Sequence, residues 1–353
     1  MEAGVETSTK DSSSAQKTFA TLDLVIPMYD EAPVLPALFE ALRATFTPET
    51  CSKFGIASVN CLYVDDGSRD ASVASVQAEP FERLGVRILR LSRNFGHQAA
   101  VSAGVANSSA DLVAVMDADL QDPPELILEM IEQWRNGFEV VYGKRANRQE
   151  GPLKRFLYAS FYRLFRLMSP IDVPVDAGDF CLMSRRAVDE LNRLPESVRF
   201  PRGLRAWIGF PQTAVEYDRP ARAAGQSSYG WRDLYSLATE GIASMSLRPL
   251  KMAQVLAILY LLLSLGGLTA LLLNTFDQTD LHTQVNLLTI LMIASNSLIL
   301  FCLYILGAYL GRAYLEIKGR PSYIVYEDLI VREPAAVAGD RNGEHDDGTG
   351  GPP

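Results

Sequence analysis

A pair of acidic residues follows one short apolar run in a pattern suited to binding a cation. Asp117 and Asp119 flank a single small residue after the run 112–116, and Gln121-Asp122 come next. Alternate positions at the end of a strand can aim two carboxylates at one point, where hard oxygen ligands select Mg²⁺ or Mn²⁺. Such an ion, bridging phosphate oxygens, would neutralise a diphosphate leaving group. A solvated acidic turn is the alternative interpretation.

A second acidic cluster, Asp65-Asp66-Gly67-Ser68, follows the apolar run 59–64. Its side chains have the donors and acceptors to hydrogen-bond a nucleobase or a ribose. The same residues are also typical of a turn with a helix N-cap at Ser68 or Asp70, and both interpretations can hold together.

The elements around these clusters are expected to be alternating strands and helices. Apolar runs predict strands at 22–27, 59–64, 86–91, 112–116 and 139–142, with helices at 34–46, 97–106 and 124–135. This alternation predicts an α/β domain with a mostly parallel sheet, in which ligands bind at the carboxyl ends of the strands. Polar clusters stand at four of these ends: Tyr29-Asp30-Glu31, Asp65-Asp66, Asp117-Ala118-Asp119 and Lys144-Arg145.

Two long uncharged runs occupy the last third of the chain. Residues 252–276 contain 25 residues without a charge and residues 283–311 contain 29. Each exceeds the roughly 20 residues that cross a bilayer as a helix. We therefore expect two transmembrane helices, at about 252–276 and 285–310. The loop 277–282 holds two Asp and no Lys or Arg, whereas both outer flanks are basic, so the positive-inside rule places both flanks in the cytoplasm.

The charge balance differs along the chain. The total of 33 Lys and Arg against 42 Asp and Glu gives −9, which argues against a protein that coats nucleic acid. Residues 1–144 carry 11 basic and 21 acidic side chains, whereas residues 145–251 carry 17 and 11. The four Cys have no metal-ligand spacing, so we expect small buried side chains in a reducing compartment.

The basic middle contains a stretch that suits the surface of a membrane. Residues 151–168 place Lys and Arg among Phe, Leu and Tyr, as expected for a helix lying at the lipid interface. A second such helix could occupy 231–247. An ordinary amphipathic helix packed on the domain is the alternative.

Several motifs together resemble glycosyltransferase family 2. They are Ile26-Pro27-Met28-Tyr29-Asp30-Glu31, Val64-Asp65-Asp66-Gly67-Ser68, Asn94-Phe95-Gly96-His97-Gln98 and the stretch Met116 to Pro124. Within that family the chain is similar to the polyprenyl-phosphate glycosyltransferases, which include dolichyl-phosphate mannose synthases and bacterial undecaprenyl-phosphate glucosyltransferases. The likeness runs from about residue 22 to about residue 330, including the C-terminal apolar runs.

The resemblance implies a GT-A fold and a set of site residues. The nucleotide sugar would be bound by Pro27, Tyr29, Glu31, Asp65, Asp66, Asp117, Arg202 and Arg222. Mg²⁺ or Mn²⁺ would be held by Asp117, Asp119 and Gln121, and the acceptor phosphate by Lys144 and Arg145. The catalytic residues would be Asp119, Asp117, Arg145 and Asp179, where Asp179 is a base, a sugar ligand or a structural cap.

The implied reaction moves a hexose from a nucleotide sugar to a polyprenyl phosphate such as undecaprenyl phosphate, with inversion. Glucose from UDP-glucose is the first expectation. A lipid phosphate has a second pKa of about 6, so it is largely an anionic nucleophile at pH 7 and needs no strong general base. The expected partners are the nucleotide sugar, the lipid phosphate and the bilayer, with no nucleic acid, and a homo-oligomer is compatible with two spans.

The expected organisation has five parts: a disordered start at 1–18, a glycosyltransferase domain at 19–230, a juxtamembrane helix at 231–250, two transmembrane helices within 251–311, and a cytoplasmic tail at 312–353 that is disordered from about 334. We expect a multi-pass protein of the cell membrane with its catalytic domain and both termini in the cytoplasm. Two other functions stay open, a processive polysaccharide synthase and a non-catalytic membrane scaffold that binds nucleotide sugars.

Overall fold

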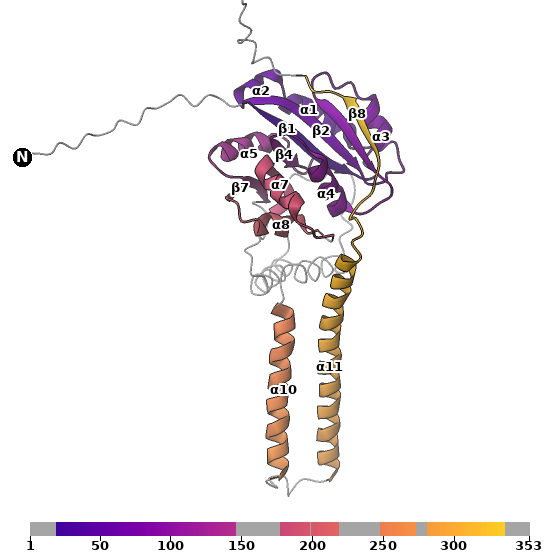
Figure 1. Cartoon of the computed structure of the whole chain (residues 1–353), viewed down its shortest axis with the longest axis vertical. Helices are drawn as coiled ribbons and strands as arrows, with labels where there is room; N and C mark the ends of the chain where they lie inside the picture. Colours follow the sequence, from indigo (N-terminus) through magenta and orange to yellow (C-terminus); the bar gives the residue numbers. More distant parts are fainter. Residues whose placement is uncertain (1–18, 146–176, 198, 219–247, 273–280, 336–353) are drawn as a thin grey trace, which may run out of the picture.

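The computed structural model describes residues 19–145, 177–197, 199–218, 248–272 and 281–335. Three expected features lie outside the described residues: the disordered ends, the interfacial helix at 151–168 and nearly all of the juxtamembrane helix at 231–250. The described residues form an α/β domain and two long helices (Figure 1).

The domain is built on one eight-stranded sheet with the order β7-β5-β6-β4-β1-β2-β3-β8. The strands are β1 Ala20–Met28, β2 Ile56–Asp65, β3 Gly85–Leu91, β4 Leu112–Val115, β5 Val140–Arg145, β6 Ala177–Ser184, β7 Gln212–Tyr217 and β8 Val325–Arg332. The four strands β4-β1-β2-β3 are parallel to one another, and so are β5 and β7. β6 and β8 run antiparallel to their neighbours. The predictions of an α/β class and a mostly parallel sheet are confirmed.

Helices cover both faces of this sheet. They are α1 Leu35–Thr45, α2 Pro48–Lys53, α3 Ser72–Ala78, α4 His97–Asn107, α5 Leu126–Arg135, α7 Arg185–Arg193 and α8 Pro201–Trp207. One buried cluster joins the sheet to α1, α3 and α5, and a second joins the opposite face to α4, α7 and α8. The predicted helices at 34–46, 97–106 and 124–135 therefore correspond to α1, α4 and α5.

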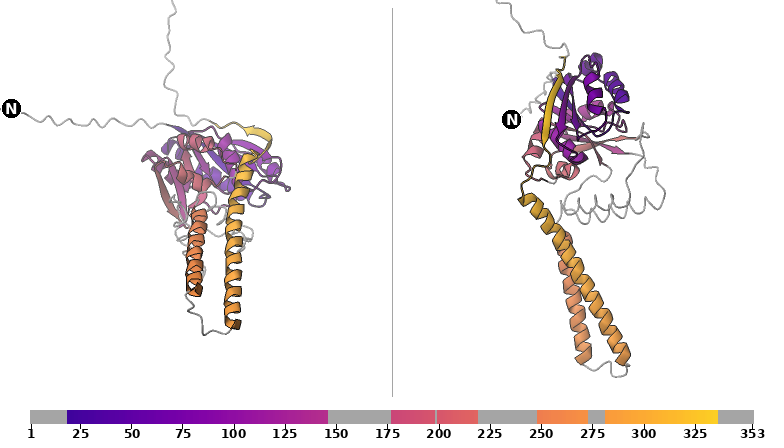
Figure 2. Two further views of the ribbon diagram at one scale, coloured as in Figure 1. Left: turned by 60° about the horizontal axis from the view of Figure 1, so that its bottom comes forward. Right: turned by 90° about the vertical axis from the view of Figure 1, so that its right-hand side faces the viewer.

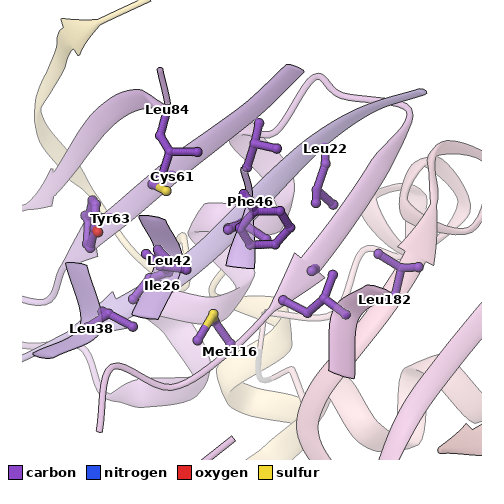
Figure 3. Close-up of a cluster of buried hydrophobic side chains, with 14 of the residues drawn as sticks. Leu22, Ile26, Leu38, Leu42, Phe46, Cys61, Tyr63, Leu84, Met116 and Leu182 are labelled. Atoms are coloured by element: carbon purple, nitrogen blue, oxygen red, sulfur yellow. The ribbon is translucent and has the colours of Figure 1, made fainter. Parts of the chain in front are cut away.

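The central strand β1 is buried on both faces, which explains its continuous apolar sequence. Leu22 and Ile26 face the α1 side, whereas Val25 faces the α4 side. Figure 3 shows Ile26 beside Leu38 and Leu42 of α1, with Leu22 farther along β1. All of these side chains are 1% exposed or less, so β1 is fixed from both sides and its carboxyl end has a fixed position.

Helix α4 lies unusually close to the sheet at Gly104. A Cβ added at Gly104 would lie 2.2 Å from Cγ1 of Val25 and 3.0 Å from Cγ2 of Val64. Contacts under 3.0 Å do not occur without movement of one partner, so only Gly permits this approach. The contact sets the height of α4 above β1 and β2, and therefore the position of His97 at the start of the helix.

Two long helices extend away from the domain, α10 Arg248–Leu272 and α11 Leu281–Ile317 (Figures 1 and 2). They lie side by side, and the Tyr260 hydroxyl donates to the carbonyl of Leu291 at 3.1 Å. Within the described residues, one stretch is long and apolar enough to cross a membrane, Leu288–Ile317, while the apolar stretch of α10 covers Leu250–Gly266. The span predicted at 285–310 thus has a helix of sufficient length, and the two-helix transmembrane hairpin stays a prediction.

The chain returns to the domain after α11, contrary to the expectation of a tail at 312–353. Residues 325–332 form β8, which pairs antiparallel with β3 at the edge of the sheet. α11 itself continues to Ile317, beyond the predicted end of the span. β8 is largely exposed and carries the charged residues Glu327, Asp328 and Arg332, which fits an edge position, where one side of the strand stays in solvent.

Replacing Gly104 by Ala tests the close approach of α4. We expect overpacking to cost about 1–3 kcal/mol and to lower the thermal midpoint of the purified protein by about 2–10 °C. Gly307→Ala is the matched control, since Gly307 lies in α11 with nothing within 4 Å of an added Cβ. Differential scanning fluorimetry measures both; equal midpoints in the two variants would contradict a tight contact between α4 and the sheet.

Candidate active site

Polar loops leave the carboxyl ends of the four parallel strands at one edge of the sheet. β2 follows on one side of β1 and β4 lies on its other side, so the direction of winding reverses between β1 and β4. In sheets of this kind the loops separate at the reversal and leave a crevice for a ligand. The residues after β1 and after β4, 29–31 and 116–122, stand where this topology is expected to leave a crevice.

The loops after β1 and β2 are tied together by hydrogen bonds. The Asp30 carboxylate accepts from the amide of Arg69 at 2.7 Å, and the Ser68 hydroxyl accepts from the amide of Asp30 at 3.1 Å. The Ser72 hydroxyl accepts from the amide of Glu31 at 2.9 Å. Asp30 has a φ of 55°, a conformation that non-glycine residues rarely adopt and that the surrounding bonds must maintain.

Asp65 and Asp66 are buried and hold backbone groups. The two oxygens of Asp66 accept from the amides of Phe95 and Gly96 at 2.7 and 2.8 Å, which fixes the loop between β3 and α4. Burial raises the pKa of Asp66, and these two hydrogen bonds oppose the shift. One oxygen of Asp65 accepts from the amide of Ser68 at 2.9 Å. Both carboxylates therefore shape the loops around the crevice.

The side chains of Pro27, Tyr29 and Glu31 differ in exposure. Pro27 is buried within β1, Glu31 is half-buried, and Tyr29 is 40% exposed. Of these three predicted nucleotide-binding residues, Tyr29 and Glu31 therefore have side chains that a ligand can reach.

Asp117 lies in a group of carboxylates at the end of β4. Burial, together with the charges of Asp122, Asp179 and Asp119, raises the pKa of Asp117 to about 6, although the charge of His97 opposes this shift. An ordinary carboxyl group has a pKa near 4, so both burial and the neighbouring carboxylates disfavour the charged form of Asp117. A cation placed beside Asp117 would relieve that repulsion.

His97 bridges two of these carboxylates. Its Nε2 atom lies 3.6 Å from Asp117 and 3.4 Å from Asp179. Burial lowers the pKa of His97, but the hydrogen bond to Asp179 and the charges of both carboxylates raise it above the ordinary value. His97 therefore supplies partial positive charge between Asp117 and Asp179.

Asp179 is held by a fork of hydrogen bonds. Arg202 donates from Nε and Nη2 to its two oxygens at 2.9 and 3.0 Å, and the Gln98 side chain donates at 3.0 Å. Arg205 donates to the backbone carbonyl of Asp179 at 3.2 Å. Burial alone would raise the pKa of Asp179, but the Arg202 guanidinium and the His97 hydrogen bond hold it well below its usual range. This arrangement favours a structural role over that of a proton acceptor.

The loop that carries Asp119 has a constrained backbone. Asp119 accepts from the amide of Gln121 at 3.1 Å, and the intervening Leu120 has a φ of 57°. Asp122 is buried and accepts a hydrogen bond from the hydroxyl of Tyr217 on β7. These bonds fix the segment that directly follows the Asp117–Asp119 pair.

The predicted metal ligands fit a cation that takes several of its ligands from a substrate. Among the described residues, no group of three or more His, Cys, Asp and Glu side chains is placed to hold a metal ion. Asp117 and Asp119 offer carboxylate oxygens and Gln121 offers an amide oxygen, all donors that suit Mg²⁺ or Mn²⁺. Mg²⁺ is usually held by one or two carboxylates together with substrate phosphates, so this donor set fits such an ion.

Lys144 and Arg145 are the last two residues of β5, and the expectation that they follow the strand is wrong. The pairing of β5 with β7 continues through Arg145 and Tyr217, because β7 extends the ladder beyond the apolar residues. The Lys144 ammonium lies 2.7 Å from Glu216 in an exposed ion pair. The side chain of Arg145 and all of Arg222 lie outside the described residues.

The structure thus brings Asp117, Asp119, Asp179 and Arg202 into one group. It adds two residues to which the sequence interpretation gives no role, His97 and Gln98. The signal that could have found them is their position, since they follow β3 in the same way that the acidic clusters follow β2 and β4.

Comparisons with known proteins give a consistent result. The family model described as "Glycosyl transferase family 2" matches residues 23–191. An uncharacterized glycosyltransferase of Bacillus subtilis, YkcC, is 40% identical over 312 residues, covering 87% of this chain and 94% of that protein. A bactoprenol glucosyl transferase of Shigella phage SfII is 34% identical over 308 residues, covering 86% of this chain and 97% of that protein.

A solved structure of a mannosyltransferase from Pyrobaculum calidifontis, in complex with GDP-Man and Mn²⁺, is also similar. It has a TM-score of 0.47 and 15% identity, and the match covers 84% of this chain and 88% of that one.

Replacing Arg202 by Met tests the Asp179 fork. We expect a loss of roughly 2–4 kcal/mol at pH 7, discounted for the partial exposure of Arg202, because a buried carboxylate loses its partner. The deficit should shrink at pH 4, where the unpaired carboxyl group takes up a proton while the wild-type pair stays ionised.

Thermal midpoints at both pH values measure this effect. Arg193→Met is the control, since Arg193 forms an exposed pair with Glu190 and its loss should change the midpoint by less than about 1 °C. A deficit for Arg202→Met that is independent of pH would contradict an ionised Asp179.

Proposed function

The chain belongs to glycosyltransferase family 2, and we propose that it transfers a hexose from a nucleotide sugar to a polyprenyl phosphate in the membrane. The best candidate for the donor is UDP-glucose, and undecaprenyl phosphate is the best candidate for the acceptor. The relatives named bactoprenol glucosyl transferase support this choice, since they match this chain over nearly their whole length.

One observation carries the proposal. The group of carboxylates lies at the carboxyl end of β4. The chain returns from α11 to the carboxyl ends of the same parallel strands, where the amide of Ser92, after β3, donates to the carbonyl of Ile324 at 2.9 Å. A site that joins a soluble donor to a lipid phosphate needs its acidic edge near its membrane anchor. The α11 helix, with Leu288–Ile317 apolar over 30 residues, supports such an anchor.

The donor would lie in the crevice between the loops after β1 and β4. Tyr29 and Glu31 would contact the nucleotide with their side chains, while Pro27, Asp65 and Asp66 would shape the pocket from within the sheet edge. Arg202, with Asp179, would lie next to the sugar of the bound nucleotide sugar. Arg222 is the last of the residues proposed to bind this donor. Because the carboxylates of Asp65 and Asp66 already accept hydrogen bonds from backbone amides, we assign them to shaping the pocket and not to contacting the nucleotide.

Asp117 and Asp119, with Gln121, would hold one Mg²⁺ or Mn²⁺ ion. When bound, such an ion neutralises the charge that develops on the leaving diphosphate. The raised pKa of Asp117 supports this assignment, because burial and the neighbouring carboxylates both disfavour its negative charge and a bound cation would offset both effects.

Lys144 and Arg145 would bind the acceptor phosphate, as cations at the end of β5. The phosphate oxygen forms the new bond to the anomeric carbon while the bond from that carbon to the diphosphate breaks, so the configuration inverts. Because the phosphate is already anionic near pH 7, the reaction needs no strong base. The low pKa of Asp179 agrees with that requirement.

The proposal includes the arrangement in the membrane. α10 and α11 would form a two-helix hairpin, with the α/β domain and both termini in the cytoplasm of a cell with a polyprenyl-phosphate pathway. The basic stretch at 151–168 would lie on the membrane surface and a homo-oligomer would bury more of the hairpin. The processive synthase is distinguished by its product: one sugar per lipid supports the proposal, whereas a polymer overturns it.

Replacing Asp119 by Ala should abolish transfer. Loss of a carboxylate that holds the metal and the diphosphate should lower kcat/KM by at least about 100-fold. Transfer of labelled glucose from UDP-glucose to undecaprenyl phosphate measures the effect in the purified full chain.

Asp189→Ala is the control for this variant, because Asp189 is an exposed acidic residue on α7 whose contact is with Arg185. Its activity should stay within about twofold of wild type. Full activity in Asp119→Ala would sink the metal assignment, and a wild-type chain that transfers no sugar would favour the scaffold interpretation.

Chelation gives an independent test of the metal. EDTA should reduce transfer to background, and addition of Mg²⁺ or Mn²⁺ in excess should restore it, because the two carboxylates need a cation to accept a diphosphate. Thermal midpoints recorded with and without EDTA show whether the fold is intact. Undiminished transfer in EDTA by a folded protein would exclude a dissociable ion.

A further inference from the structure

β8 follows α11 and is the outermost strand of the sheet, where it pairs with β3. It pairs with β3 from Leu91 opposite Val325 to Val86 opposite Arg332. The strand therefore begins at the carboxyl end of β3, next to the loops that follow the parallel strands, and runs toward the amino end of β3. The proposed reaction does not in itself require this strand, so its contacts with the rest of the domain indicate what it contributes.

Two ion pairs join β8 to β3. Arg87 donates from Nε and Nη2 to the two oxygens of Asp328 at 2.8 and 2.6 Å. Arg90 donates from Nη1 to Glu327 at 2.8 Å. Glu327 and Asp328 are adjacent in the strand, so the two pairs lie on opposite faces of the sheet.

The two arginines contact different parts of the domain beyond β8. Arg87 donates to the carbonyl of Asn107, at the end of α4 that lies away from the crevice. Arg90 instead places its Nε atom 3.5 Å from Oδ2 of Asp65, a carboxylate that is 1% exposed. Arg90 thus reaches the loop after β2, and Arg87 does not.

Through Asp65, Arg90 is linked by hydrogen bonds to the loop after β2 and to the loop after β1. The other oxygen of Asp65 accepts from the amide of Ser68, and the Ser68 hydroxyl accepts from the amide of Asp30. A displaced Asp65 carboxylate would release Ser68, and with it the bond to the loop after β1. The Glu327 carboxylate and the ring of Tyr326, 5.8 Å from the guanidinium, hold Arg90 from the solvent side.

We infer that Arg90 and Glu327 are positioning residues for nucleotide binding: β8 orients Arg90, and Arg90 orients the Asp65 carboxylate that shapes the 65–68 loop. This inference rests on the proposed function, since it assigns the loops after β1 and β2 to the donor nucleotide. It also gives the strand after α11 a part in the site, because the chain that leaves the membrane helix supplies Glu327.

The test compares the two ion pairs in the full chain purified in detergent. Arg90→Met and Glu327→Gln remove the pair that reaches Asp65, while Arg87→Met and Asp328→Asn remove the pair that does not. UDP with Mg²⁺ is the probe, titrated by calorimetry, and thermal midpoints show whether each variant is folded. Steady-state assays with UDP-glucose separate KM from kcat.

We expect Arg90→Met to raise both the Kd for UDP and the KM for UDP-glucose by about 5–20-fold, with kcat within about threefold of wild type. Glu327→Gln should raise them by about 2–5-fold, and Arg90→Lys, which keeps the charge, should recover part of the affinity lost in Arg90→Met. Arg87→Met and Asp328→Asn should leave the Kd within about twofold, even where the thermal midpoint falls.

Equal changes of Kd in the two pairs would overturn the inference, because they would show that β8 acts only by completing the sheet. Wild-type affinity in Arg90→Met and Glu327→Gln would overturn it as well. A wild-type chain that binds neither UDP nor GDP would instead refute the proposed function, and the inference would fall with it.

Discussion

The candidate site depends on holding several carboxylates together at one edge of a sheet. Burial, together with the charges of Asp122, Asp179 and Asp119, raises the pKa of Asp117 to about 6. Neighbouring carboxylates repel one another unless cations or hydrogen-bond donors compensate their charge. Arg202, Gln98 and His97 compensate Asp179, and Tyr217 donates to Asp122. Asp117 is left with the partial charge of His97, so the compensation is incomplete where a ligand would bind.

The acidic residues of the domain therefore divide into two kinds. Asp30, Asp65 and Asp66 accept hydrogen bonds from backbone amides and hold the loops in place. Asp117 and Asp119 stand on a constrained loop after β4 and are suited to a cation, with Asp119 also accepting from the amide of Gln121 two residues on. Both kinds follow apolar strands in the same way, so their spacing alone does not separate them. The surrounding donors do, because each buried carboxylate needs partners that only the folded chain brings near.

The sequence predicted the central part of the fold well and its edges poorly. β1 to β4 are mostly apolar because much of both faces is buried, and polar residues follow their carboxyl ends as expected. β8 lacks the continuous apolar or alternating pattern of a predicted strand, and its partner β3 precedes it by more than 230 positions, so no local pattern identifies the pairing. The hydrogen bonds between Asp179 and Arg202, which join β6 to α8, were unpredictable for the same reason. The complementary charges are visible in the sequence, but the topology decides whether they meet.

The position of β8 has a consequence for the order in which the domain can be completed. β3 lies at the edge of the sheet until residues 325–332 are available, and those residues are synthesised after both long helices. A nascent chain would hold an unpaired strand edge for the whole time needed to make and place α10 and α11. Exposed edges of this kind promote association with other chains. A chain truncated after α11 would lack the edge strand and would be expected to aggregate, even though every residue from β1 to β7 is present.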